Sequence, residues 1–160
     1  MKTYSAIAVA KRFLVLAQSE NKSLSNMKLQ KLVFFSQVVS LKMNGKPIHE
    51  NASLAWDFGP VVRELYDVVH QLATDRSNKQ ISLSDTDVKN AFDGVEDIED
   101  DEVLGITKAV WDKFKDWTAF QLSDLTHRPG SPWAFVYANR QYDEIPLDLI
   151  REKGFGDASI

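Results

Sequence analysis

Two aspartate–histidine pairs are the residues of this 160-residue chain whose types and spacing could do chemistry. Asp67 and His70 lie three positions apart, and so do Asp124 and His127. On a helix such pairs share a face, so each could offer a carboxylate and an imidazole to a metal ion. A dinuclear site would also need inward carboxylates from two other helices, and the first two predicted helices have none. The pattern therefore favours helix-end histidines with acidic neighbours.

The sequence shows no other set of catalytic or cofactor-binding residues. It has no cysteine, which excludes a thiolate zinc site and a Cys–His nucleophile. It also has no phosphate-binding loop of the GxxxxGK[ST] or GxGxxG type. The paired carboxylates at Asp100 and Asp101 lie within an acidic run that is expected to be solvated. We therefore predict no catalytic residues, no cofactor, no metal and no small-molecule substrate.

The segment 54–62 is the element around which the rest of the chain is organised. Large apolar residues alternate with small or polar ones up to Phe58, which predicts an extended arm with its apolar groups on one side. Gly59 and Pro60 then favour a sharp turn into a helix over residues 60–74, with the proline in the first helical turn.

Apolar residues at helical spacing, together with capping residues and glycines that end helices, predict the other helices. They cover residues 4–19, 27–43, 100–117 and 119–127, a helix that opens at Pro132, and residues 146–153, and residues 86–92 could add a weak helix. The first two should pack as an antiparallel hairpin, with Lys28 and Lys31 on the solvent side. Residues 81–83 could form a short strand beside the extended arm.

These elements predict one mainly α domain over residues 1–160. It should be a compact domain of about six to seven helices, with at most a minimal two-stranded β pair. A chain of this length can bury a core without disulfides. The N-terminus lacks the apolar run of a signal peptide, and no apolar run is long enough to span a membrane. We expect a cytoplasmic protein that does not bind membranes.

Charge is divided unevenly along the chain. Residues 1–47 hold eight basic residues and one acid, whereas the segment from Asp93 to Glu102 holds seven acids and no base. The two halves can pair with each other or offer a charged face to a partner. The basic residues are interleaved with aromatic ones, which gives weak support for nucleic-acid binding. The aromatic residues lie at core spacing, however, and the net charge of −4 argues against nucleic acid.

The aromatic content points to a different kind of partner. Four tryptophans, nine phenylalanines and four tyrosines exceed what a small helical core needs. Tryptophan and tyrosine dominate the energetics of protein–protein contacts. The Trp56 arm and the Trp133 turn are the expected surface positions, because loops present contact residues more easily than helices do.

Four segments resemble, in the right order, sequence motifs of the Panacea-domain (SocA-like) antitoxins of type II toxin–antitoxin systems. They are Asn26–Leu32 with Phe34–Gln37, Gly45–Ile48, Ala55–Val62, and Leu122–His127 followed by Pro132–Trp133. The resemblance extends over about residues 7–138, nearly the whole chain. Residues 84–101 and the tail 141–160 match the family poorly.

The resemblance implies the antitoxin of a bacterial or prophage toxin–antitoxin pair, which binds and occludes its cognate toxin and has no enzymatic activity. The residues expected to bind that partner are Trp56, Phe58, Gly59, Pro60, Val61, His127 and Trp133. Three other functions stay open: an adaptor that delivers a partner to a protease, a helical metal-dependent enzyme using the two Asp–His pairs, and a nucleic-acid-binding protein. The sequence does not determine the toxin, the contact surface or the oligomeric state.

Overall fold

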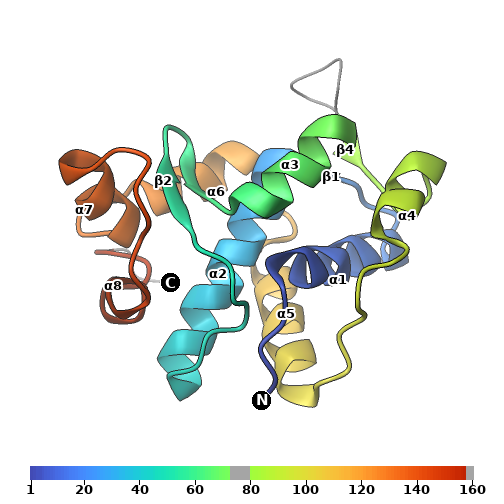
Figure 1. The fold of residues 1–160 in the computed structure, drawn as a ribbon, viewed down its shortest axis with the longest axis horizontal. Helices are drawn as coiled ribbons and strands as arrows, with labels where there is room; N and C mark the ends of the chain where they lie inside the picture. Colours follow the sequence, from blue (N-terminus) through green and yellow to red (C-terminus); the bar gives the residue numbers. More distant parts are fainter. Residues whose placement is uncertain (73–79, 158–160) are drawn as a thin grey trace.

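The computed structural model describes residues 1–72 and 80–157. Over these residues the protein is mainly α, as predicted, with eight helices and two short β pairs (Figure 1). The helices are α1 (Ala6–Ser19), α2 (Asn26–Asn44), α3 (Arg63–Leu72), α4 (Thr86–Phe92), α5 (Asp101–Phe114), α6 (Ala119–Thr126), α7 (Pro132–Asn139) and α8 (Leu147–Lys153). The strands are β1 (Leu24–Ser25), β2 (Leu54–Trp56), β3 (Gly59–Val61) and β4 (Gln80–Ile81). Within this described part, none of the helices has the length and hydrophobicity needed to cross a membrane.

Helix α2 runs through the middle of the molecule, and the other elements pack around it (Figure 1). It contacts α1, α3, α5, α6 and α8, and 12 of its 19 residues are buried. Helix α1 lies across α2, so the predicted antiparallel hairpin is wrong (Figure 1). Because α2 is surrounded by other helices, the solvent-side prediction for Lys31 is also wrong, and this residue is only 1% exposed. Lys28 is partly buried.

The helix ends follow local sequence signals, as predicted. Ser25 accepts a hydrogen bond from the Lys28 backbone N–H at the start of α2, and Gly45 ends that helix in the left-handed region. Thr118 and Gln121 form a capping box at the start of α6. Helix α6 therefore begins at a fixed residue, which sets the positions of the polar side chains at its C-terminal end.

The predicted extended arm is one strand of a hairpin. β2 pairs with β3 in antiparallel register, and Asp57 and Phe58 form the turn between them. Pro60 therefore lies in a strand, and α3 begins only at Arg63. The prediction of a helix from Pro60 is thus wrong, while its predicted end at Thr74 lies outside the described residues.

The hairpin stays extended beyond Pro60 because a glutamine of α2 holds its exit. The Val62 N–H donates to Gln30 Oε1 at 3.0 Å, and Gln30 Nε2 donates to Val62 O at 3.1 Å. Both backbone groups of Val62 are thereby bound to one buried side chain. The helix begins directly after this residue, at Arg63.

The second β pair joins β1 to β4, with Leu24 opposite Ile81. The predicted pairing of residues 81–83 with the arm is therefore wrong. The outer edge of β2 is covered by residues 142–145, which exchange backbone hydrogen bonds of 2.9 Å with Ala55. A segment far along the chain thus completes the hairpin as a third, irregular strand.

A second glutamine of α2 holds the loop that precedes β2. Gln37 Oε1 accepts the N–H groups of Ile48 at 2.8 Å and His49 at 3.3 Å, and Gln37 Nε2 donates to His49 O at 3.1 Å. Ser40 Oγ donates to Lys46 O at 2.6 Å. Polar side chains of α2 thus bind backbone groups that would otherwise be buried without partners.

The oppositely charged segments of the chain pair with each other. Lys2 binds Glu96, and Lys11 binds Asp97 at 2.9 Å. The Tyr4 hydroxyl accepts the backbone N–H groups of residues 99 and 100. The acidic run is therefore fastened against the basic N-terminal segment, and part of its charge is neutralised there.

Replacing Gln37 with methionine should lower the free energy of unfolding by about 2–4 kcal/mol, because buried backbone groups at Ile48 and His49 lose their partners. Urea denaturation measures the change. Gln18→Met on the exposed side of α1 is the matched control and should change stability by less than about 0.5 kcal/mol. Equal effects of the two substitutions would contradict the scaffold role of Gln37.

Candidate functional site

The seven residues predicted to bind a partner come together around one turn, which we call the hairpin tip (residues 56–60). Trp56 and Gly59 pair across the hairpin. His127 is the C-cap of α6, Trp133 lies in the first turn of α7, and both side chains contact the tip. Sequence motifs that are far apart along the chain therefore build a single site.

Side chains from α6 and α7 bind the first two carbonyl groups of the tip. Trp133 Nε1 donates to Trp56 O at 2.7 Å. His127 Nε2 lies 3.3 Å from Asp57 O, and its Nδ1 lies 2.5 Å from the Ser123 carbonyl oxygen. Both nitrogens of the imidazole thus face backbone carbonyls, which fixes the plane of the ring against the turn.

Two further carbonyl groups of the tip are bound from α6 and α2. Ser123 Oγ donates to Phe58 O at 2.9 Å, and Lys31 Nζ donates to Pro60 O at 3.4 Å. Three of the five tip carbonyls therefore accept hydrogen bonds from side chains outside the hairpin, and a fourth, that of Asp57, faces the His127 imidazole. The backbone of the turn is held on three sides, so its conformation is fixed before any partner arrives.

Aromatic rings hold the residues that support the tip. The Trp133 ring contacts the His127 imidazole at a centroid distance of 3.8 Å and stacks on Tyr137 at 4.5 Å. Trp56 packs edge-on against Tyr66 of α3 at 5.0 Å. The Trp56–Tyr66 contact joins the hairpin to α3, and the Trp133–His127 contact joins α7 to the end of α6.

Asp57 is bound by two phenol groups. The hydroxyls of Tyr137 and Tyr142 both donate to Asp57 Oδ1, at 2.6 and 2.8 Å. These hydrogen bonds, that of Tyr137 above all, lower the pKa of the Asp57 carboxyl, so it stays ionised at neutral pH. Tyr142 has a positive φ of 66°, an uncommon backbone conformation for a large side chain. The chain thus accepts local strain at the residue that delivers this hydroxyl.

Gly59 is the point of closest approach between the tip and the rest of the protein. Its φ is +110°, and a Cβ atom there would lie 2.7 Å from both Lys31 Cε and Thr126 Oγ1. A side chain would therefore strain the backbone and collide with α2 and α6. Glycine lets the turn seat directly on these two helices.

Lys31 lies beneath the tip as a buried amine. Its ammonium group donates to Pro60 O and forms no ion pair among the described residues. Burial lowers the pKa of Lys31 from 10.5 to about 7, because the charged form is poorly solvated there. Lys31 therefore loses its proton at a much lower pH than a solvent-exposed lysine does.

The residues that support the tip are covered, and a different set faces solvent. Of the seven predicted residues, Phe58 alone is largely exposed, at 68%. Trp133 is buried, so the expectation that this residue lies at the surface is wrong, whereas Trp56 is half-buried. Phe120 in α6 and Phe135 in α7 are also mostly exposed. The largely exposed aromatic residues among those described are therefore three phenylalanines, one of them at a predicted position, and Tyr142.

The two Asp–His pairs do not form a common centre. His70 is exposed on α3, where it stacks on Tyr66 at 5.1 Å. His127 faces the backbone carbonyls of Asp57 and Ser123 instead. Over residues 1–72 and 80–157, no group of three or more histidine, aspartate or glutamate side chains is placed to hold a metal ion.

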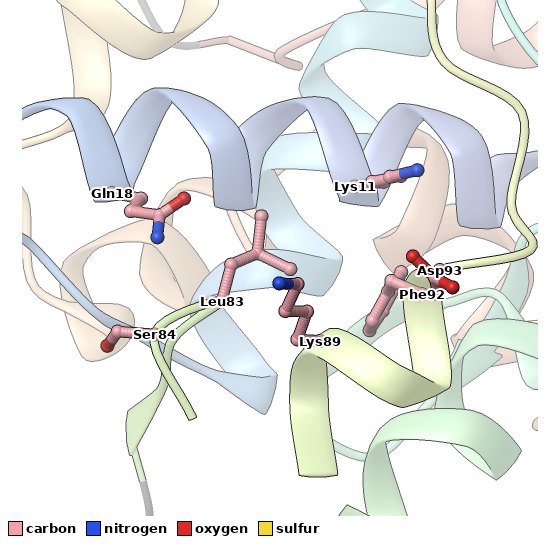
Figure 2. A pocket seen from close by; sticks show the side chains of 7 residues that line it. All are labelled: Lys11, Gln18, Leu83, Ser84, Lys89, Phe92 and Asp93. Atoms are coloured by element: carbon pink, nitrogen blue, oxygen red, sulfur yellow. The ribbon is translucent and has the colours of Figure 1, made fainter. Parts of the chain in front are cut away.

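A hollow of about 490 Å³ lies between α1 and α4 (Figure 2). Leu83 and Phe92 line it together with Lys11, Lys89 and Asp93. Figure 2 shows the Lys11 side chain at one end, and its ammonium group is already bound to Val95 O and Asp97. The walls combine opposite charges with apolar groups and select no ligand class, so the hairpin tip remains the candidate site.

Several residues that support the tip escaped the sequence reasoning. Lys31 was assigned to solvent, and Ser123 was given no role, although both lie within the segments that resemble the family motifs. Their position as polar residues inside these segments could have indicated a role in the site. Tyr137 and Tyr142 carried no signal, because their contact with Asp57 depends on how the C-terminal segment returns to the hairpin.

Comparison with known families decides the assignment. The sequence model of the family described as antitoxin SocA-like, Panacea domain, matches residues 29–134, about two thirds of the chain. The protein belongs to the SocA-like antitoxin family. No curated protein and no solved structure matches the chain significantly.

The matched region of this SocA-like antitoxin contains the whole hairpin tip. It also contains the four side chains that bind the tip carbonyls, namely those of Lys31, Ser123, His127 and Trp133. Tyr137 and Tyr142 lie beyond its end. The family region therefore contains the side chains that support the tip. The two tyrosines that bind Asp57, which we call the Asp57 clasp, come from the segment that follows it.

Gly59→Ala should lower the free energy of unfolding by at least about 2 kcal/mol, through backbone strain and the collision with Lys31 and Thr126. Gly105→Ala is the matched control, because a Cβ on this exposed α5 residue meets nothing within 4 Å. It should stabilise the protein by about 0.5–1 kcal/mol. Chemical denaturation of both variants measures the difference, and a neutral Gly59→Ala would refute the close seating of the turn.

Lys31→Met should be at least as stable as the wild type at pH 7, and its relative stability should fall as pH rises to 9. Lys31 has a lower pKa when folded, so between about pH 7 and 10.5 the unfolded wild type binds more protons than the folded form. Wild-type stability should therefore rise by about 1 kcal/mol per pH unit relative to the variant. Urea denaturation at pH 7, 8 and 9 measures this. The exposed Lys113→Met control should follow the wild-type pH dependence.

Proposed function

We propose that this SocA-like antitoxin neutralises a cognate toxin by binding it directly and occluding its active surface with the hairpin tip. The family supports the antitoxin role. The observation that carries the choice of surface is the exposed Phe58 side chain, presented on a turn whose carbonyls are bound by surrounding side chains. We place this interaction in the cytoplasm.

A fixed turn is well suited to tight binding. A flexible loop loses conformational entropy when it binds, whereas a preorganised one has already lost it during folding. Here the loss is offset by the hydrogen bonds from Lys31, Ser123 and Trp133 and by the contact with the His127 imidazole. Phe58 can therefore enter a pocket of the toxin with little further ordering of its backbone.

The surroundings of Phe58 extend the apolar surface. Phe120 lies one helical turn before Ser123, whose hydroxyl binds Phe58 O, so both residues of α6 lie on the side facing the tip. Phe120 is 74% exposed. Two exposed phenylalanines near charged residues such as Asp57 and Asp124 fit an interface with an apolar centre and a polar rim.

Occlusion differs from protease delivery in what it requires. In the occlusion mechanism, purified antitoxin inhibits the purified product of the adjacent toxin reading frame without any other protein. An adaptor instead rescues growth only in cells with a working protease. Rescue in protease-deficient cells, together with inhibition between the purified proteins, supports occlusion, and loss of both would favour the adaptor.

Phe58→Ala should weaken binding of the adjacent reading frame's product by about thirtyfold or more, as expected for an aromatic anchor at the centre of an interface. The melting temperature should stay unchanged, because the side chain is 68% exposed. Met43→Ala is the matched control, since this residue is 72% exposed at the end of α2. Calorimetry gives both affinities, and growth rescue gives the cellular effect. Wild-type affinity of Phe58→Ala would exclude the tip as the contact surface.

A further inference from the structure

Only one of the two oxygens of the Asp57 carboxylate accepts hydrogen bonds from the residues that the structure describes. Its Oδ1 accepts the hydroxyls of Tyr137 and Tyr142, whereas its Oδ2 makes no hydrogen bond in the part of the chain that the structure describes. No lysine or arginine in that part forms an ion pair with Asp57. Arg140 pairs with Asp143 instead, at 3.5 Å. An exposed, oriented anion therefore stands beside Phe58 without a cation.

We propose that Asp57 is the receptor for a basic side chain of the toxin, with arginine the best fit. This inference rests on the proposed function, because it names the chemistry of the contact that the hairpin tip makes. The partner's cation binds the free edge of the carboxylate while Phe58 fills an adjacent apolar pocket.

The geometry favours a cation over a neutral donor. Two phenol hydroxyls fix the carboxylate of this exposed residue through one oxygen, so the orientation of the other oxygen is defined as well. Charge-assisted hydrogen bonds to a carboxylate are stronger than neutral ones, and the guanidinium group can also lie over an aromatic face. Exposed Phe58 offers such a face on the next residue.

Asp124 and Glu144 are exposed nearby on elements that contact the hairpin, and neither forms an ion pair within the described residues. Together they favour approach of a basic surface.

Asp57→Asn tests the charge without removing the clasp, because the asparagine oxygen can still accept both tyrosine hydroxyls. Binding of the purified product of the adjacent reading frame should weaken at least about tenfold at 50 mM NaCl. The difference in affinity between the variant and the wild type should become smaller as NaCl is raised to 500 mM, because salt screens the attraction that the variant has lost. Asp87→Asn on α4, at the far end of the molecule from α7, removes the same charge and should bind within about twofold of the wild type (Figure 1).

Two further variants separate a binding role from a purely structural one. Tyr137→Phe with Tyr142→Phe removes the clasp but keeps the charge, so it should retain the salt dependence of wild-type binding. If Asp57 only held the C-terminal segment, this double variant would lose affinity, whereas Asp57→Asn, which keeps both tyrosine hydrogen bonds, would bind like the wild type. Replacing surface arginines and lysines of the partner one by one with alanine should find one whose loss weakens the wild type but not Asp57→Asn.

The outcomes distinguish this inference from the function on which it rests. If Asp57→Asn binds within about twofold of the wild type while Phe58→Ala is weakened, the cation receptor is wrong and the binding surface stands. Failure of the wild type itself to bind overturns both. Weaker binding by Asp57→Asn, with a smaller salt dependence and a matching basic residue on the partner, establishes the contact.

Discussion

The structure depends on one constraint: helix α2 is surrounded by other elements, so the non-helical backbone packed against it needs hydrogen-bond partners where water is excluded. Helical backbone groups are already paired, so side chains must supply the bonds. Gln37 binds the loop before the hairpin, Gln30 binds its exit, and Lys31 binds the Pro60 carbonyl. Leaving such groups unpaired costs about 1–3 kcal/mol each, so these three residues decide where the irregular segments can lie.

In the hairpin tip, the backbone carbonyls contact the rest of the protein, whereas the side chains of Asp57 and Phe58 are exposed. Its carbonyls are bound by Ser123, His127 and Trp133 as well as by Lys31, and none of these contacts depends on the side chains of Asp57 or Phe58. These backbone contacts are therefore independent of which side chain stands at position 58. Under the proposed function, such a scaffold can change that side chain, and with it the partner, while it keeps the backbone hydrogen bonds of the turn.

Local sequence signals predicted most of the helices, because capping residues and apolar spacing act within a few residues of one another. The failures arose where distant parts of the chain meet. Proline at a first helical position is a sound local rule, yet Pro60 lies in a strand because Gln30 keeps the following residue extended. Lys31 was assigned to solvent because an amphipathic helix normally has a wet side, and α2 lacks one. The seven candidate residues do lie together in the structure. However, His127 and Trp133 were predicted as partner-binding residues from the family resemblance and not from their spacing in the sequence.

A buried amine beneath the tip is a costly way to bind one carbonyl, and its position suggests what the cost achieves. Desolvation lowers the pKa of Lys31, so the folded state is disfavoured wherever the unfolded chain would keep the proton. An apolar residue of the same length would avoid this cost but would leave Pro60 O without a donor and let the turn shift on a smooth surface. Buried polar contacts often contribute less to stability than to the choice of one arrangement over others. With Gly59 seated against Lys31 and Thr126, a displacement of the tip would break the hydrogen bond and lose the fit together. We infer that the buried amine lowers the stability of the fold but restricts the turn to a single position. A preorganised binding surface, as in the proposed function, requires this property.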